Sequence, residues 1–151
     1  MTVIRRATPE DLPELAEMVR EFYAVDGHVH DGAVVAEALG PLLRDDLFGQ
    51  VWMFDSGYAV VTWGYSIESG GRHALLDELY VRSRGTGVGG RVIEEVYEHC
   101  AGLGIPRMML ETERHNDRAR RFYARHSFVE EDSVWFSRGD SLGHVEPTAV
   151  D

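Results

Sequence analysis

Arg84-Gly85-Thr86-Gly87-Val88-Gly89-Gly90 lies between an apolar run that predicts a strand, residues 74–81, and an amphipathic run that predicts a helix, residues 88–103. A glycine-rich turn in this position exposes backbone N–H groups at the positive end of a helix dipole, where they can bind phosphate. Glycine also permits φ > 0 and lets the backbone come close to a ligand. We therefore expect the chain to hold a phosphate-bearing ligand at this turn.

The spacing of the loop selects among known phosphate-binding motifs. A Walker loop ends in Gly-Lys-Ser/Thr, and this chain contains no lysine. We prefer the pattern Arg-x-x-Gly-x-Gly, which Arg84, Gly87 and Gly89 match, to the dinucleotide fingerprint G-x-G-x-x-G.

The preferred pattern resembles the pyrophosphate loop of the GNAT superfamily of N-acetyltransferases. A second stretch, residues 116–128 with the sequence NDRARRFYARHSF, resembles the later motif of this family, N-x-x-A-x-x-F-Y-x-x-x-G-F. Ser127 stands where the family usually has glycine. Residues 76–81 also resemble the family's fourth strand, so the resemblance covers residues 57–136.

This resemblance implies a fold and a co-substrate. The fold is α/β (of the α+β kind), with one domain over residues 1–138, a mixed central sheet and about four flanking helices. Residues 139–151 are expected to form a flexible C-terminal tail. Acetyl-CoA is the implied co-substrate, without a metal, and its pantetheine arm would pair with the strand before the loop like an added strand. The residues implied to bind the coenzyme are Leu79, Tyr80, Val81, Arg84, Gly85, Thr86, Gly87, Val88, Gly89, Gly90 and Asn116, although helix capping would also explain Asn116.

Three residues are candidates for proton transfer. The resemblance implies that Tyr123 protonates the departing thiolate. Asp77 and Glu78 are candidate general bases, because the resemblance implies that a carboxylate at this place acts as base, directly or through water. Burial would raise its pKa and suit it to that role. Adjacent strand residues point to opposite faces, so only one of the two can enter a given cleft, and the choice stays open. A salt bridge or an ammonium-binding role is the alternative, and Tyr65 and Glu68 are further candidates to contact the amine.

Composition restricts the class of partner. The 151 residues suit one domain, and the net charge of −11 is unevenly spread. Residues 82–125 hold nine arginines against six acids, whereas the rest of the chain is strongly acidic. This balance favours a cationic substrate and argues against nucleic acid. We expect no membrane span or signal peptide, hence a cytoplasmic protein, and the family resemblance makes a homodimer possible.

Periodicity and turn residues predict the order of the elements. The expected strands are 3–6, 51–54, 58–67, 74–81 and 108–112, followed by a closing strand pair at 129–131 and 134–137. The expected helices are 9–26, 31–43, 88–103 and 117–126. The strands from 51 to 81 are expected to form a meander.

We expect acetyl transfer to a primary amine of a small cationic molecule, by direct attack in a ternary complex. Four alternatives stay open: a protein amino group as acceptor, another donor such as a longer acyl-CoA or an aminoacyl carrier, a non-catalytic acyl-CoA sensor, and a scaffold that keeps only the fold. His28, His30 and Asp31 do not complete a metal site. Cys100 is expected to be buried rather than nucleophilic.

Overall fold

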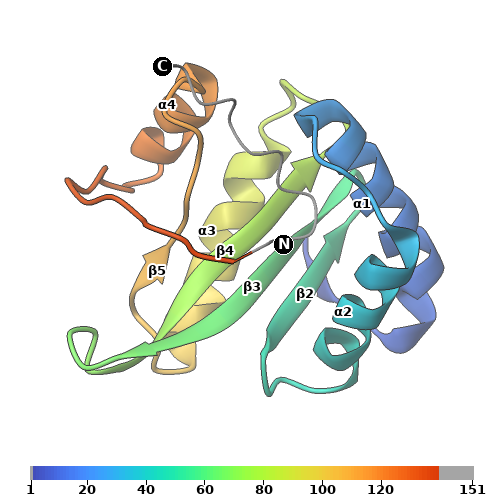
Figure 1. Cartoon of the computed structure of the whole chain (residues 1–151), viewed down its shortest axis with the longest axis horizontal. Coiled ribbons are helices and arrows are strands. Elements are labelled where there is room, and N and C mark those ends of the chain that lie inside the picture. The colour runs from blue at the N-terminus through green and yellow to red at the C-terminus, as the bar shows by residue number, and fades with distance from the viewer. Residues whose placement is uncertain (1, 140–151) are drawn as a thin grey trace.

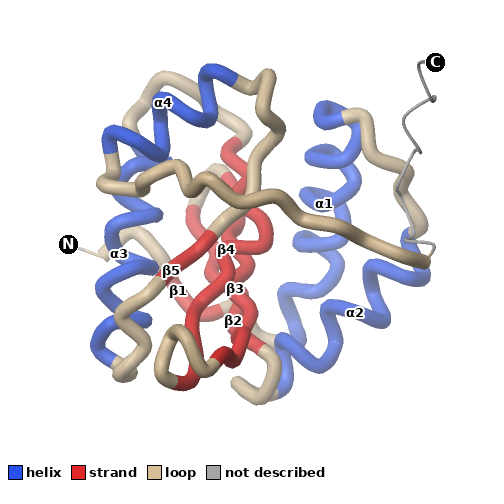
Figure 2. Tube along the Cα trace, turned by 60° about the vertical axis from the view of Figure 1, so that its left-hand side comes forward, coloured by secondary structure: helices blue, strands red, loops and turns tan. Residues whose placement is uncertain are grey.

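A five-stranded mixed sheet separates α1 and α2 on one face from α3 on the other (Figures 1 and 2). The computed structural model describes residues 2–139, so residues 140–151 of the expected tail lie outside the described residues. The strands are β1 (Arg5–Arg6), β2 (Gly49–Phe54), β3 (Gly57–Ser66), β4 (Gly71–Val81) and β5 (Met108–Met109). The helices are the 3-10 turn η1 (Pro9–Asp11), α1 (Leu12–Asp26), α2 (Gly32–Arg44), α3 (Val88–Gly102) and α4 (Asp117–Arg125). None of the helices in this described part is long and apolar enough to cross a membrane.

The sheet runs in the order β1-β2-β3-β4-β5. The first four strands are antiparallel neighbours, which confirms the predicted meander, and β3 and β4 pair from Gly57↔Val81 to Ser66↔Gly71. The helix α3 then carries the chain back to β5, which lies parallel to β4. The result is a hairpin-built sheet with one β-α-β crossover at its edge.

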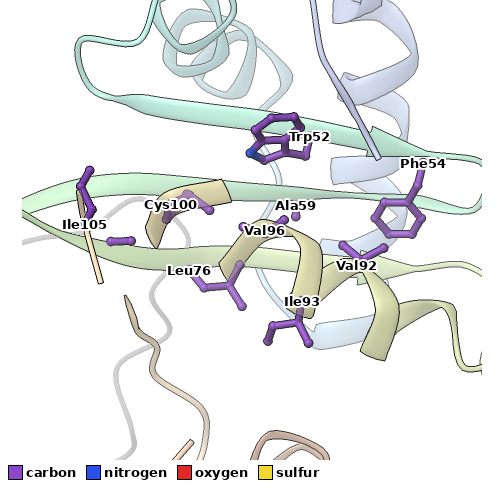
Figure 3. Packing of buried hydrophobic residues seen from close by; sticks show 11 residues of the cluster. Trp52, Phe54, Ala59, Leu76, Val92, Ile93, Val96, Cys100 and Ile105 are labelled. Atoms are coloured by element: carbon purple, nitrogen blue, oxygen red, sulfur yellow. The ribbon is translucent and has the colours of Figure 1, made fainter. Parts of the chain in front are cut away.

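Two apolar clusters hold the layers together. One packs α3 against β2, β3 and β4 and is the cluster drawn in Figure 3. The other packs α1 and α2 against the opposite face. Alternation along β2 divides its side chains between the clusters: Trp52 and Phe54 face α3, whereas Val51 and Met53 face α1 and α2.

Local signals explain where the helices begin and end. The Asp31 carboxylate accepts hydrogen bonds from the amides of Ala33 and Val34 and so caps α2. Gly27 ends α1 with φ +74°, a conformation that glycine adopts without penalty. Both boundaries agree with the sequence prediction to within one residue.

The predicted closing strand pair is wrong. Residues 129–139 form no strand, and β5 extends over only two residues instead of the predicted 108–112. Val129, Val134, Trp135 and Phe136 are 68 to 91% exposed. Apolar and aromatic residues favour a strand only when a paired neighbour exists, and the outer edge of so short a β5 offers no ladder. Ion pairs from Arg107 and Arg120 to residues 131 and 130 hold the start of this segment instead.

The hairpin between β2 and β3 depends on Gly57. A Cβ at this position would overlap the carbonyl oxygen of Tyr80 and lie 2.9 Å from Cζ of Phe54. We predict that Gly57→Ala lowers the free energy of unfolding by about 3 kcal/mol, because the backbone of β4 must move. Gly102→Ala is the control, since its Cβ meets no atom within 4 Å and it should be neutral or stabilising by up to about 1 kcal/mol. Urea denaturation of both variants tests this, and equal stabilities would contradict it.

Candidate active site

The loop before α3 carries its glycines in the left-handed region. Gly85 has φ +84° and Gly87 has φ +78°, and a Cβ at either position would meet no atom within 4 Å. Conformation rather than space therefore requires glycine at both. Arg84 and Thr86, which are also implied coenzyme contacts, are exposed in the same loop.

The first amides of α3 have no acceptor within the helix. Gly87 is the N-cap and provides no side-chain cap, and the first bond of the helix runs from the Arg91 amide to the Gly87 carbonyl. Val88 donates only a long bond, 3.4 Å, to the preceding threonine hydroxyl. The amides of Gly89 and Gly90 precede the first intrahelical bond. Together with the positive end of the helix dipole, these amides can bind an anion.

Gly90 also lets α3 approach α4 closely. A Cβ on Gly90 would lie 2.8 Å from Nε2 of His126, whereas one on Gly89 would lie at an ordinary 3.6 Å from Phe122. His126 is itself held by Glu94 of α3, at 2.9 Å. The glycines of this motif therefore serve the backbone conformation, the exposed amides and the packing of two helices.

The loop and α4 carry exposed arginines. Arg84 in the loop and Arg118 and Arg121 on α4 are exposed, and none of them forms an ion pair within residues 2–139. Arg82 differs, because Glu21 of α1 binds it with contacts of 2.8 and 3.1 Å. The unpaired arginines can therefore attract phosphate, whereas Arg82 ties β4 to α1.

The edge of β4 that faces β5 is open along most of its length. Pairing of β5 with β4 is confined to Ala74↔Met108 and Leu75↔Met109. Beyond Leu75 the two strands part, as Figure 1 shows. Residues 79–81 pair with β3 on one side, and no strand among residues 2–139 pairs with their other side, so an extended group could pair there. This is the position that the sequence predicts for the pantetheine arm.

A β-bulge at Asp77 divides β4 into two halves. Val60 of β3 pairs with Glu78 and Val61 pairs with Leu76, so Asp77 has no partner across β3. The extra residue reverses the alternation of faces. Before the bulge the even-numbered residues face α3, and after it the odd-numbered ones do. The side chains that pack on the α3 side are therefore Ala74, Leu76, Leu79 and Val81.

The bulge separates the two candidate bases. Glu78 faces α1, where its Oε2 accepts a hydrogen bond from Tyr23 and its Oε1 accepts one from Tyr58, both at 2.6 Å. Burial raises the pKa of Glu78, and the two phenols oppose that rise. Asp77 is exposed and makes no hydrogen bond with the described residues, although nearby protein still raises its pKa by desolvation. Neither Tyr23 nor Tyr58 was predicted from the sequence as a site residue.

Tyr123 lies on the last turn of α4 among aromatic rings. Its ring makes edge-to-face contacts with Phe122 and Phe128, at 5.0 and 5.6 Å between centroids. Burial raises the pKa of Tyr123 to about 12. Its hydroxyl forms no hydrogen bond within the described part of the chain, so it has no structural partner there.

Two cavities adjoin these elements. The larger, about 1050 Å³, lies between α3, β5, α4 and residues 128–135, and Tyr123 is the single implied catalytic residue in its lining. No residue of β4 or of the glycine loop lines it, so it lies beside the predicted coenzyme path. The smaller, about 410 Å³, lies between the end of α1 and the loop before α4, where Asp26, His28, Glu113 and Asn116 contribute to its wall. Asn116 caps α4 through a 3.1 Å bond from the Ala119 amide.

Other candidates lie away from this region. Tyr65 pairs with Arg72, six residues before Glu78 on β4, which places it roughly 20 Å away at the opposite end of the hairpin. Glu68 lies in the turn at that same end. Both residues therefore lie far from Glu78 and from the glycine loop, and their contact with the amine stays a prediction. Cys100 is fully buried, and burial raises the pKa of its thiol to about 11.

Two of the polar residues after α1 have local partners. His28 lies 3.1 Å from the Asp26 carboxylate, and Asp31 caps α2. Within residues 2–139, no group of three or more histidine, cysteine, aspartate or glutamate side chains is arranged to hold a metal ion.

The profile of the acetyltransferase (GNAT) family matches residues 8–128. The chain belongs to this family. The matched region spans α1 to the end of the α4 motif and so includes the glycine loop, the bulge and the open edge of β4. No match was found among curated protein sequences.

Solved structures share the fold. An integron cassette protein from the mobile metagenome of Cole Harbour Salt Marsh is 27% identical, with a TM-score of 0.82 over 92% of this chain and 91% of that chain. A putative acetyltransferase from an Arthrobacter species is 26% identical, with a TM-score of 0.80 over 92% and 96%. An aminoglycoside acetyltransferase from an uncultured soil metagenomic sample, at 21% identity and a TM-score of 0.73 over 91% and 95%, shares the fold alone.

The arrangement of the strands around this loop, rather than the spacing of its glycines, distinguishes it from a dinucleotide-binding loop. Gly85, Gly87 and Gly90 also satisfy G-x-G-x-x-G. Here, however, the strand before the loop is the last of an antiparallel meander, whereas the dinucleotide fold surrounds its loop with parallel strands. The family match supports the preferred pattern.

A charge introduced at the loop should prevent coenzyme binding. We predict that Gly87→Asp weakens acetyl-CoA binding at least 100-fold, because the carboxylate would compete for the free amides and repel the diphosphate. Gly104→Asp is the matched control: its φ of +83° imposes similar strain, and its Cβ is equally free of contacts, but it lies beyond the other end of α3. Calorimetric titration in low salt tests this. Equal affinities for the two variants would contradict the assignment of the loop.

Proposed function

We propose that this chain is an acetyl-CoA-dependent N-acetyltransferase that acts on a primary amine of a small cationic molecule. The observation that carries the proposal is the order of features along β4 and its loop. The free amides of α3 come first, the open edge at residues 79–81 comes next, and the bulge at Asp77 follows, roughly 13 Å from Val81 along the strand. A thioester carrier with a diphosphate at one end would meet these features in that order.

In the proposed reaction, the side chains of Glu78 and Tyr123 carry out the proton transfers. The amine nitrogen attacks the thioester carbonyl carbon, so the C–N bond forms and the C–S bond breaks. A carboxylate takes the proton that the amine loses, directly or through water, and we assign this role to Glu78. The departing thiolate takes a proton from Tyr123, which regains one from solvent. Backbone groups of Leu79, Tyr80 and Val81 hold the arm in line.

Two properties favour Glu78 over Asp77 as the base. Its carboxylate faces α1, away from the edge that the coenzyme would occupy, so acceptor and donor can approach from different sides. Its two phenol partners fix its orientation, whereas Asp77 is exposed and has no such support. A base held in one geometry favours proton transfer.

The acidic surface supports a cationic acceptor. Asp26, Glu113 and Asp117 lie around the smaller cavity beside the end of α1, with a single arginine, Arg118, in its wall. The net charge of −11 acts in the same direction at longer range. A panel of spermidine, glucosamine and lysine, assayed with acetyl-CoA by thiol release, tests the reaction. Binding of acetyl-CoA without turnover of any amine would favour an acyl-CoA sensor instead.

The two carboxylates should differ in their effect on turnover. We predict that Glu78→Gln lowers kcat by about 100-fold or more, because the amine loses its proton acceptor. Asp77→Asn, the matched control on the same strand, should change kcat less than about tenfold. Circular dichroism and thermal melting establish that both variants are folded. A larger loss in Asp77→Asn would transfer the role to that residue.

Removal of the Tyr123 hydroxyl should affect chemistry more than binding. We predict that Tyr123→Phe lowers kcat at least tenfold and leaves the Kd of acetyl-CoA within a factor of two, because the ring contacts with Phe122 and Phe128 remain. Tyr97→Phe is the control, since that hydroxyl bonds to the Pro106 carbonyl away from β4. Turnover and calorimetric affinity are both measured. An unchanged kcat would remove Tyr123 from the mechanism.

A further inference from the structure

Glu78 is held by two tyrosines that come from different elements. Tyr23 lies on the last turn of α1 and donates to Oε2, whereas Tyr58 lies at the start of β3 and donates to Oε1. Both distances are 2.6 Å, in the range of short bonds to an ionised oxygen. Tyr58 is fully buried and Tyr23 is half-buried, so neither phenol is a mobile surface group.

We propose that Tyr23 and Tyr58 are positioning residues, which hold the Glu78 carboxylate as a single fixed anion on the α1 side of β4. This inference rests on the proposed function, in which Glu78 is the base. One phenol on each oxygen leaves each oxygen a further lone pair that can accept a proton. The two phenols therefore orient the carboxylate and still leave each of its oxygens able to accept a proton.

The phenols replace the water that burial removes. A carboxylate taken from water loses its solvation, and it stays ionised only when donors compensate that loss. Tyr23 and Tyr58 supply one donor each, and burial together with the neighbouring carboxylate raises the pKa of both phenols above the ordinary value. They therefore remain neutral donors across the pH range in which the enzyme would work. Without them, the buried carboxyl would hold its proton to a higher pH.

Few other charged groups face Glu78. Asp77 precedes Glu78 on β4, and its negative charge raises the pKa of Glu78. His28 follows α1, and the positive charge of its protonated ring lowers that pKa. The hydroxyl of the nearby Tyr80 turns instead to Glu21. The two phenols are therefore the direct donors to the carboxylate among residues 2–139.

Tyr23 also connects the carboxylate to the acceptor side of the molecule. Its ring makes edge contacts with His28 and His30, at 5.7 and 6.2 Å between centroids, and both lie in the turn between α1 and α2. His28 contributes to the wall of the smaller cavity. The wall of the smaller cavity is therefore in contact with a residue that holds Glu78.

The pH profile separates a positioning role from simple packing. At saturating acceptor, ionisation of the free amine does not contribute, and the acid limb of kcat reports protonation of the base. Removing a donor destabilises the carboxylate and raises its pKa, so activity is lost at a higher pH. We expect Tyr23→Phe and Tyr58→Phe each to move the acid limb upward by about one pH unit, with plateau kcat within tenfold of the parent. Tyr97→Phe should leave the limb in place.

A direct titration keeps the test independent of turnover. The side-chain carboxyl carbon of Glu78, labelled with carbon-13 and assigned by its loss in Glu78→Gln, is followed by NMR from pH 4 to 9 in the full chain. The carboxyl pKa should rise in both tyrosine variants and stay unchanged in Tyr97→Phe. This measurement also serves if a variant is too unstable for kinetics at the extremes of pH.

The outcomes distinguish the two proposals. If the parent protein acetylates no amine of the panel but the Glu78 pKa still rises in the variants, the proposed function is contradicted, whereas the positioning of Glu78 by Tyr23 and Tyr58 is supported. If the parent is active and neither the acid limb nor the carboxyl pKa moves, the tyrosines only pack against Glu78 and the inference is overturned. If Glu78→Gln retains parental activity, Glu78 is not the base, and the positioning role of Tyr23 and Tyr58 in the reaction is contradicted as well.

Discussion

The early end of β5 is the constraint on which the site depends. Because β5 pairs with β4 only at Ala74 and Leu75, the remainder of this edge of β4 pairs with no other strand in the described part of the chain. Such an edge is normally covered or paired, since free N–H and C=O groups attract further strands. Here it begins where the two strands part and continues to the loop that exposes the α3 amides. A ligand with an extended arm and an anionic end would satisfy both features at once.

The bulge at Asp77 provides the second requirement, which is access from two sides. Without the extra residue, alternation would place Glu78 on the same face as Leu76, toward α3. With it, Glu78 faces α1 and its tyrosine partners, while Leu79 and Val81 still pack into the α3 cluster. One inserted residue therefore keeps the apolar side of β4 continuous and moves a carboxylate to the side where the acceptor is proposed to bind. The edge between those faces pairs with no strand among residues 2–139 beyond Leu75, and the proposed donor would occupy it.

The sequence predicted the features that local chemistry determines. Gly87, Asp31 and Gly27 mark helix ends through their own backbone or capping preferences, and the meander follows from short turns. The bulge was missed, although the apolar spacing from Leu76 to Leu79 breaks strict alternation and could have indicated it. The phenol pair that holds Glu78 depends on contacts 20 and 55 residues apart, which no local pattern encodes. The prediction of the closing strands was wrong for a related reason. A strand needs a partner, and the sequence does not show where that partner lies.

Burial also decides whether Tyr123 can act as an acid. With its pKa raised to about 12, it is a poor donor to a thiolate in water, where a thiol has a pKa of about 8.5; the gap would cost roughly 5 kcal/mol. A thiolate formed inside the protein is more basic. Cys100 provides the comparison within this chain, because burial raises the pKa of its thiol to about 11. A coenzyme thiolate desolvated to the same degree would be matched to Tyr123 within about one unit. In the proposed reaction, the phenol would therefore be an effective acid only when the acyl end of the carrier is enclosed, which would make the proton transfer depend on completion of the bound complex.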